Sequence, residues 1–136
     1  MGIMLAEIAA HMQTAAIGTI GATSGWTIRV AEIPDTPDTS ISLYETSGMA
    51  SDFVLDGARD VNPGLQVRVR GARNGYLTAR GKAEDIDDLL DGIANTVIGT
   101  HTYKWIRAVH QPVFLGHEPG TDRPQWSQNF RICRDP

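Results

Sequence analysis

The sequence predicts one α+β domain: a mostly antiparallel β-sheet of five or six strands with two helices packed on one face. Two observations predict this class. Five or six segments alternate apolar with polar residues or form short apolar runs, whereas only two segments repeat apolar residues at the spacing of a helix. Because two helices are too few to connect that many parallel strands, the sheet is expected to be antiparallel.

The composition fits a single folded unit over residues 1–136. At 41% hydrophobic and 21% charged residues, it is that of an ordinary globular protein able to bury a core. The net charge of −4 argues against nucleic-acid binding, which requires a clustered cationic surface. Residues 1–60 carry eight acids and two bases, and residues 61–136 carry eight acids and ten bases, which is compatible with a polarised surface.

The N-terminal part begins with a helix. Apolar residues at helical spacing predict it over residues 3–16, and three glycines place a loop at 18–25. Alternation then predicts strands at 26–33 and 40–46, separated by a Pro-Asp turn at 34–38 where proline excludes regular structure. Charged residues interrupt the first helix, so it is neither a secretory signal nor a membrane span, and we expect a cytosolic origin.

A strand, a glycine turn and a long helix occupy the middle of the chain. Residues 65–70 alternate, and from Tyr76 to Val97 apolar residues recur at helical spacing, with Gly99 as the expected stop. Five carboxylates lie on the polar face of this helix and are expected to be solvated. A calcium site would need these carboxylates in a non-helical loop, but the helical apolar spacing continues through them. Later strands are predicted at 100–110, 113–115 and 124–134.

Two features of the pattern point to contact with another molecule. Residues 47–64 form the longest stretch without a period, yet they contain apolar side chains, which indicates a loop buried against a partner. The second face of the sheet would carry basic side chains from several strands, Lys104 or Arg107 among them. The predicted subunit or ring contacts are Met49, Phe53, Val54, Leu55, Arg68, Arg70 and Arg131.

No pattern indicates catalysis, a cofactor or a metal. His110, His117 and Glu118 are the least improbable zinc centre, but their spacing fits neither a helical nor a turn motif, and no paired cysteines accompany them. Cys133 has no partner for an internal disulfide and no histidine in its own strand to activate it. The three tryptophans lie in predicted strands. We interpret them first as core residues and second as anchors in a protein interface. We therefore predict a protein that is not an enzyme and binds no metal or cofactor.

Several segments follow one another in a recognisable order between about residues 25 and 134. They are PDTPD (34–38) with ISLYET (41–46), LQVRVRG (65–71), LLDG (89–92), FLG (114–116) and DRPQWSQNF (122–130). In order and spacing this set resembles the tail terminator, or minor capsid, proteins of long-tailed (siphovirus-like) bacteriophages.

The resemblance implies a structural role in the virion. Proteins of this family are small α+β proteins that form a six-membered ring at the head-proximal end of the tail tube, stop its polymerisation and join it to the head. The implied partners are further copies of the chain, the tail tube protein and the head-tail connector or head-closure protein. DNA is implied only as it passes through the channel, no membrane is involved, and the protein is made in the host bacterial cytoplasm and then resides in the neck.

Two alternatives stay open. Another ring component of the neck or tail, such as a head-closure or tail-tube protein, would share these features. A small enzyme or ligand-binding domain would need a site that forms only in the fold. Stoichiometric zinc lost on His117→Ala would favour that second alternative.

Overall fold

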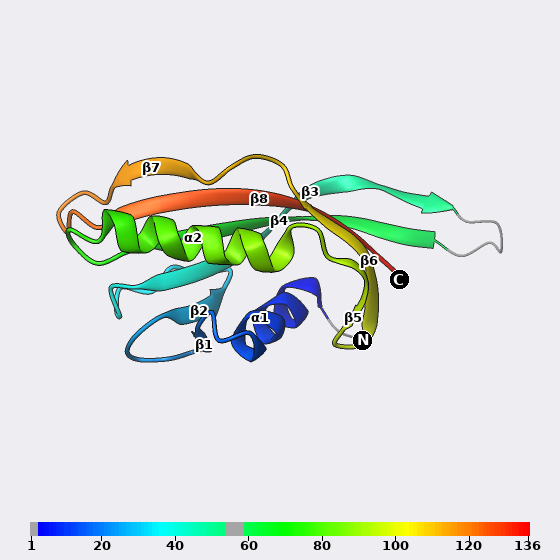
Figure 1. Ribbon diagram of the computed structural model, residues 1–136, viewed down its shortest axis with the longest axis horizontal. Helices are drawn as coiled ribbons and strands as arrows, with labels where there is room; N and C mark the ends of the chain where they lie inside the picture. The colour runs from blue at the N-terminus through cyan, green and yellow to red at the C-terminus, as the bar shows by residue number, and fades with distance from the viewer. Residues whose placement is uncertain (1–2, 54–58) are drawn as a thin grey trace.

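The computed structural model describes residues 3–53 and 59–136. Two helices and eight strands follow one another along the described chain (Figure 1). They are α1 (Met4–Thr14), β1 (Thr19–Ile20), β2 (Thr27–Val30), β3 (Ser40–Phe53), β4 (Arg59–Arg70), α2 (Tyr76–Leu90), β5 (Ala94–Ile98), β6 (His101–Ala108), β7 (Val113–His117) and β8 (Pro124–Arg134).

The strands form one sheet in the order β1-β2-β3-β4-β8-β6-β5, with β7 paired to β8 beyond the end of β6. The described pairings are antiparallel except β1 with β2 and β2 with β3, so the predicted α+β class and the mostly antiparallel sheet are confirmed. The expectation of five or six strands is wrong, because the sheet has eight. The two residues of β1 are too few to show a period, and β5 continues the apolar spacing of the preceding helix.

The described parts of the predicted loop 47–64, residues 47–53 and 59–64, are paired strands, and we call these two arms the β3–β4 hairpin. Its arms extend β3 and β4 in antiparallel register, with Met49 opposite Asn62 and irregular steps on either side of Met49. In Figure 1 this hairpin projects past the rest of the sheet. Residues 59–64 of the β4 arm do alternate between more exposed and buried positions, but the buried ones are Asp60, Asn62 and Gly64. Because these residues are not apolar, the sequence shows no strand period there.

Helix α2 ends earlier than its apolar spacing predicts. It stops at Leu90 and not at Val97, since Asp91 has an extended backbone and Gly92 has a φ of +89°, which glycine adopts without steric cost. Ile93 and Val97 keep the three- and four-residue spacing by coincidence, and Val97 is 69% exposed on β5. Gly99, the expected stop, instead makes the β5–β6 turn with a φ of +63°, where a Cβ would collide with the Glu7 carboxylate.

The core lies between the helices and the concave side of the sheet. Ile41, Leu43, Leu65 and Val67 on the central strands share one cluster with apolar residues of both helices. These helix residues are Met4, Leu5, Ile8, Ala9 and Met12 from α1 and Ala79, Ala83, Ile86 and Leu90 from α2. The prediction of two helices on one face is thus confirmed.

Strand β6 departs from the alternation predicted for residues 100–110. A bulge between Tyr103 and Trp105 changes its register against β8. Tyr103 and Ile106 are therefore both buried at 0% exposure, while Trp105 lies on the opposite face with Arg107. The simple alternation placed Tyr103 and Trp105 on the same face.

Helix α1 connects the two ends of the curled sheet. It packs against β1, β2 and β3 and also contacts β5, which gives the sheet the shape of a half-barrel (Figure 1). The buried Glu7 carboxylate links α1 to β6, β8 and the β5–β6 turn. It accepts hydrogen bonds from Tyr103 Oη at 2.9 Å, Arg134 Nη1 at 2.8 Å and the Thr100 backbone N–H at 2.8 Å. Nδ1 of His101 lies 2.9 Å from Oε1 of the same carboxylate.

These contacts set the protonation state of Glu7. Burial on its own raises the pKa of the Glu7 carboxyl, but the hydrogen bonds from His101, Thr100 and Tyr103 outweigh it and hold the pKa below the ordinary value of 4.5. Burial and the adjacent carboxylate raise the pKa of the Tyr103 phenol, which therefore stays a hydrogen-bond donor. In the sequence Glu7 only interrupts an apolar helix, so this role was not predicted.

Candidate functional site

The sheet has a second face that neither described helix covers. Because side chains alternate along a strand, the residues between the core positions point to this side. We call it the open face. It carries Ser42 and Tyr44 of β3, Gln66 and Arg68 of β4, Asn129 and Arg131 of β8, and Trp105 and Arg107 of β6. The predicted basic second face is therefore present.

The open face is hollowed near the base of the β3–β4 hairpin. We call this depression the Met49 hollow, a volume of about 420 Å³ lined by Met49, Trp105, Arg107 and Arg131. A smaller pocket of about 90 Å³ adjoins it beside Asn62. Met49 lines this depression and is 56% exposed. The hollow therefore combines apolar and cationic side chains at one place.

The arginines of the hollow lack anionic partners. Arg107 and Arg131 stand directly opposite each other in the β6–β8 register, and neither has a hydrogen bond or ion pair within residues 3–53 and 59–136. Like charges at opposed cross-strand positions destabilise a sheet. Arg68 lies further along the same face, and its buried Nε atom has no partner among the described residues. The open face is thus suited to an anionic surface of another molecule.

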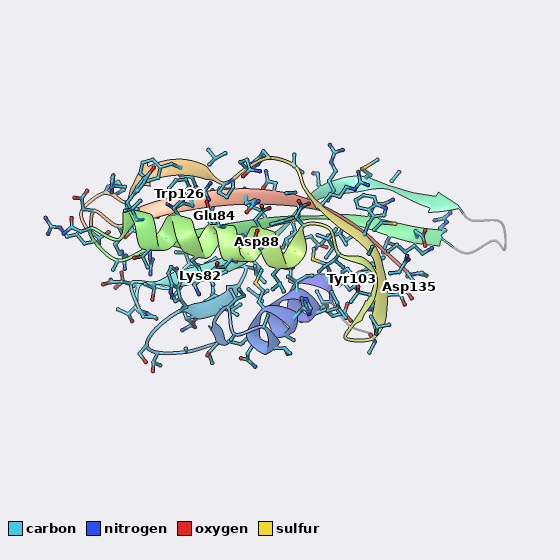
Figure 2. All side chains as sticks on the ribbon, viewed as in Figure 1. Lys82, Glu84, Asp88, Tyr103, Trp126 and Asp135 are labelled. Carbon is cyan, nitrogen blue, oxygen red and sulfur yellow. The ribbon has the colours of Figure 1, made fainter. Side chains whose placement is uncertain are left out.

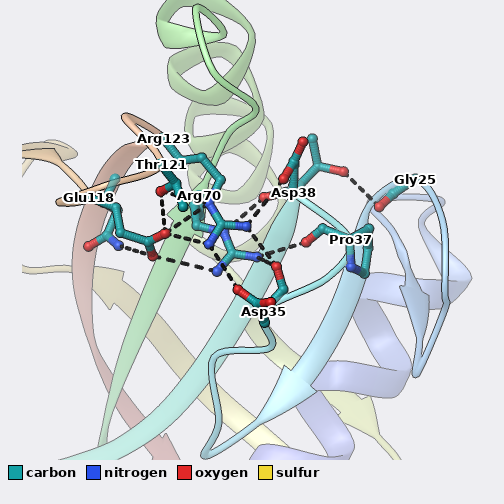
Figure 3. A network of polar contacts seen from close by, with 10 residues as sticks. Gly25, Asp35, Pro37, Asp38, Arg70, Glu118, Thr121 and Arg123 are labelled. Carbon is teal, nitrogen blue, oxygen red and sulfur yellow. Dashed lines mark hydrogen bonds and ion pairs between the residues drawn. The ribbon is translucent and has the colours of Figure 1, made fainter.

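Arg70, in contrast, is occupied inside the subunit (Figure 3). It is 3% exposed, and its guanidinium donates to the carbonyl oxygens of Asp38 at 2.9 Å and Pro37 at 2.7 Å. Its neighbour Arg123 binds the carboxylates of Glu118 and Asp38. The two arginines hold the predicted Pro-Asp turn against the β7–β8 turn. Arg70 therefore stabilises its own subunit through these contacts.

Glu118 belongs to the same network of ion pairs. A hydrogen bond from the Thr121 hydroxyl, with the charges of Arg123 and Arg70, holds the pKa of the Glu118 carboxyl below its usual value. His110 Nδ1 lies 2.7 Å from a backbone oxygen, and the His117 ring stands edge-on to Phe114. Within the described part of the chain no three His, Cys, Asp or Glu side chains are grouped as metal ligands. The absence of a metal stays a prediction.

The predicted contact residues fall into three groups. Met49 and Arg131 meet in the hollow, with Arg68 on the same face. Val54 and Leu55 lie outside the described residues, and Phe53 is described only as the last backbone position of β3. Trp105 was not predicted as a contact, and Arg107 was predicted only as an alternative to Lys104 on the basic second face. Strand alternation places Trp105 and Arg107 on one face, but only the register of β6 against β8 brings them beside Cys133 and Arg131.

None of the described helices is both long and apolar enough to cross a membrane.

Comparison with known proteins agrees with the predicted family. Residues 11–135 match the sequence profile of a family described as "Bacteriophage tail terminator protein". A solved structure described as "Virion of native gene transfer agent (GTA) particle" contains a chain with a similar fold. The TM-score is 0.67 at 16% sequence identity, over 98% of this chain and 95% of that chain. No curated protein sequence matches significantly. The chain belongs to the bacteriophage tail terminator family and is thus a structural protein of the phage tail.

Proposed function

We propose that this protein forms a closed ring, a hexamer, at the head-proximal end of the tail, where it ends growth of the tail tube and joins the tail to the head connector. The family match over residues 11–135 supports the place in the tail. The open face is the observation that most supports a ring. Its hollow and its arginines without partners among the described residues have no function within a single subunit, so they are available to bind a neighbour.

A closed ring of identical subunits requires two different patches on each subunit, one for each neighbour. The open face supplies one. Exposed apolar side chains elsewhere on the molecule supply candidates for the other, above all Leu77 on α2 at 80% exposure and Leu115 on β7 at 46%. These lie apart from the Met49 hollow, which is the arrangement that a head-to-tail contact needs.

The β3–β4 hairpin is the proposed contact along the ring axis. It projects past the body of the sheet (Figure 1), so it can reach a neighbouring ring without disturbing the core. The proposed partners on the two sides are the tail tube protein and the head connector or head-closure protein. DNA passes through the channel of the ring. The protein is made in the host bacterial cytoplasm before assembly into the neck.

The test is the mass of the purified chain, measured by native mass spectrometry alone and after mixing with tail tubes, followed by electron microscopy of the mixture. The proposal expects a species of six times the 14.8 kDa chain mass, seated at one end of each tube. Long tubes formed by the chain itself would assign it as a tail-tube protein. Bare tube ends, with the chain bound only to head connectors, would assign a head-closure role.

A further inference from the structure

The outer side of α2 carries a stripe that its own subunit does not use. Ala79, Ala83 and Ile86 face the core, so residues half a turn away face outward. We call Leu77, Gly81, Asp85 and Asp88 the outer stripe. Leu77 is 80% exposed, and Asp85 and Asp88 are exposed, with no hydrogen bond or ion pair in the described part of the chain (Asp88 in Figure 2).

Gly81 gives a second, independent indication. Glycine is among the least favourable residues inside a helix, and a Cβ built at Gly81 would have no atom within 4 Å. Nothing within the described subunit therefore requires glycine there. A helix position without a side chain lets the backbone of another molecule approach closely. Contact with another subunit therefore explains why glycine occupies position 81.

The outer stripe complements the Met49 hollow. Asp85 and Asp88 are three residues apart on a helix, which puts their Cβ atoms about 5–6 Å apart. Opposed cross-strand residues such as Arg107 and Arg131 have Cβ atoms about 5 Å apart. Two carboxylates can therefore meet two arginines at matching spacing.

The remaining parts of the two surfaces also correspond. Met49 and Trp105 offer an apolar wall in the hollow, and Leu77 is an exposed apolar side chain at the other end of the stripe. We propose that the outer stripe of one copy of this chain docks in the Met49 hollow of the next copy around the ring. This inference rests on the proposed ring and names the two patches that form it.

The placement of the two surfaces fits a ring. Helix α2 lies on the core side of the sheet (Figure 1), and the hollow lies on the open face, so the two patches are on opposite sides of the subunit. When the outer stripe of one copy docks in the Met49 hollow of the next, one hollow and one outer stripe stay free at the two ends of the pair, so that further copies can bind. Such a heterologous contact continues from subunit to subunit until it closes.

Two charge-reversal variants of the full chain test the contact. The hollow variant is Arg107→Glu with Arg131→Glu, and the helix variant is Asp85→Lys with Asp88→Lys. None of the four side chains has a hydrogen bond or ion pair in the described subunit, so the fold is expected to persist, which circular dichroism checks. Like charges facing each other across an interface weaken association by roughly a hundredfold or more. Each variant alone is therefore expected to be monomeric in native mass spectrometry at a concentration where the wild type forms rings.

An equimolar mixture of the two variants restores both charge pairings and is expected to form rings in which the variants alternate. Arg73→Glu, which reverses an exposed arginine in the β4–α2 loop, is the matched control and should assemble like the wild type. Gly81→Gln should fold normally but fail to form rings, since the added side chain fills the close approach.

The outcomes separate the two proposals. Normal rings from either variant alone, or folded variants whose mixture stays monomeric, would overturn this contact while wild-type rings keep the proposed function. If the variants form rings but no longer cap tail tubes, the hollow binds another tail protein and the inference is wrong. A wild-type chain that is monomeric with and without tail tubes would overturn both.

Discussion

Replacing Glu7 by glutamine tests how the half-barrel is closed. The Glu7 side chain is 5% exposed, and its partners His101 and Arg134 have side chains 4% and 14% exposed. Glutamine keeps the shape but removes the charge, and in either orientation its NH2 group replaces an acceptor and faces a donor, the Thr100 N–H or the Arg134 guanidinium. Removing one partner of a buried pair costs about 3–5 kcal/mol. Because Arg134 is partly exposed, we expect the lower end, about 3 kcal/mol.

The assay is equilibrium unfolding in urea with a parallel thermal melt. For a chain of this size a loss of about 3 kcal/mol lowers the Tm by roughly 10 °C. Glu84→Gln is the control, since that side chain is 60% exposed and, among the described residues, pairs with Arg80 alone, on the same helix; its effect should stay within about 0.5 kcal/mol. A Glu7→Gln protein within about 1 kcal/mol of the wild type would refute the assigned role of the carboxylate in joining α1 to β6.

The same carboxylate gives a pH dependence with a defined sign. The folded pKa of Glu7 lies below its ordinary value of 4.5, so folding favours the ionised form. Its contribution is fully present above pH 4.5 and is lost as the pH falls through the lower folded pKa. The stability difference between wild type and Glu7→Gln is therefore expected to shrink below about pH 4.5, and a difference that grows on acidification would contradict this assignment.

Three further substitutions follow from the same structure. Gly81→Ala fills open space on a helix and should raise the free energy of unfolding by about 1 kcal/mol in urea; a loss of stability would show that glycine is needed in the subunit. Ile106→Ala removes a side chain with 0% exposure and should cost about 3 kcal/mol, read from the shift of the urea midpoint at unchanged m-value. Arg123→Met breaks the bonds to Glu118 and Asp38, whose side chains are 22% and 61% exposed, and should cost about 1.5–3 kcal/mol in a thermal melt, whereas an unchanged Tm would mean that the turn is held by other contacts.

The family match and the open face bear on different questions. The match places the chain among structural proteins of the phage tail. It gives no contact residue, and the resemblance in fold to a chain of a gene transfer agent virion at 16% identity gives none either. The proposed contact comes from the unpartnered charges of Arg107, Arg131, Asp85 and Asp88 and from the shape of the surface between them.

Local chemistry let the sequence determine most of the elements. The alternation in residues 65–70 and 124–134, the apolar spacing of α1 and the prolines at 34 and 37 each reflect interactions between near neighbours, and the structure confirms them. The α+β class and the basic second face follow from these local patterns. Successive side chains of a strand point to opposite faces, so when the apolar residues face the core, the arginines between them point to the other side of the sheet. Arg68 and Arg131 were identified in this way, whereas Met49 was identified as an apolar residue in the stretch 47–64 that shows no period.

Tertiary structure decided what depends on partners distant in the chain. Arg68 and Arg70 have the same parity on one strand, yet Arg70 is taken by a turn 32 residues earlier while Arg68 stays on the open face. The bulge that buries Tyr103 exists only against β8, and Glu7 finds its partners more than 90 residues away. The hollow likewise is formed by β3, β6 and β8 together. A pattern along the chain records which residues are apolar, but only the packed sheet determines which charges meet and which are left without a partner.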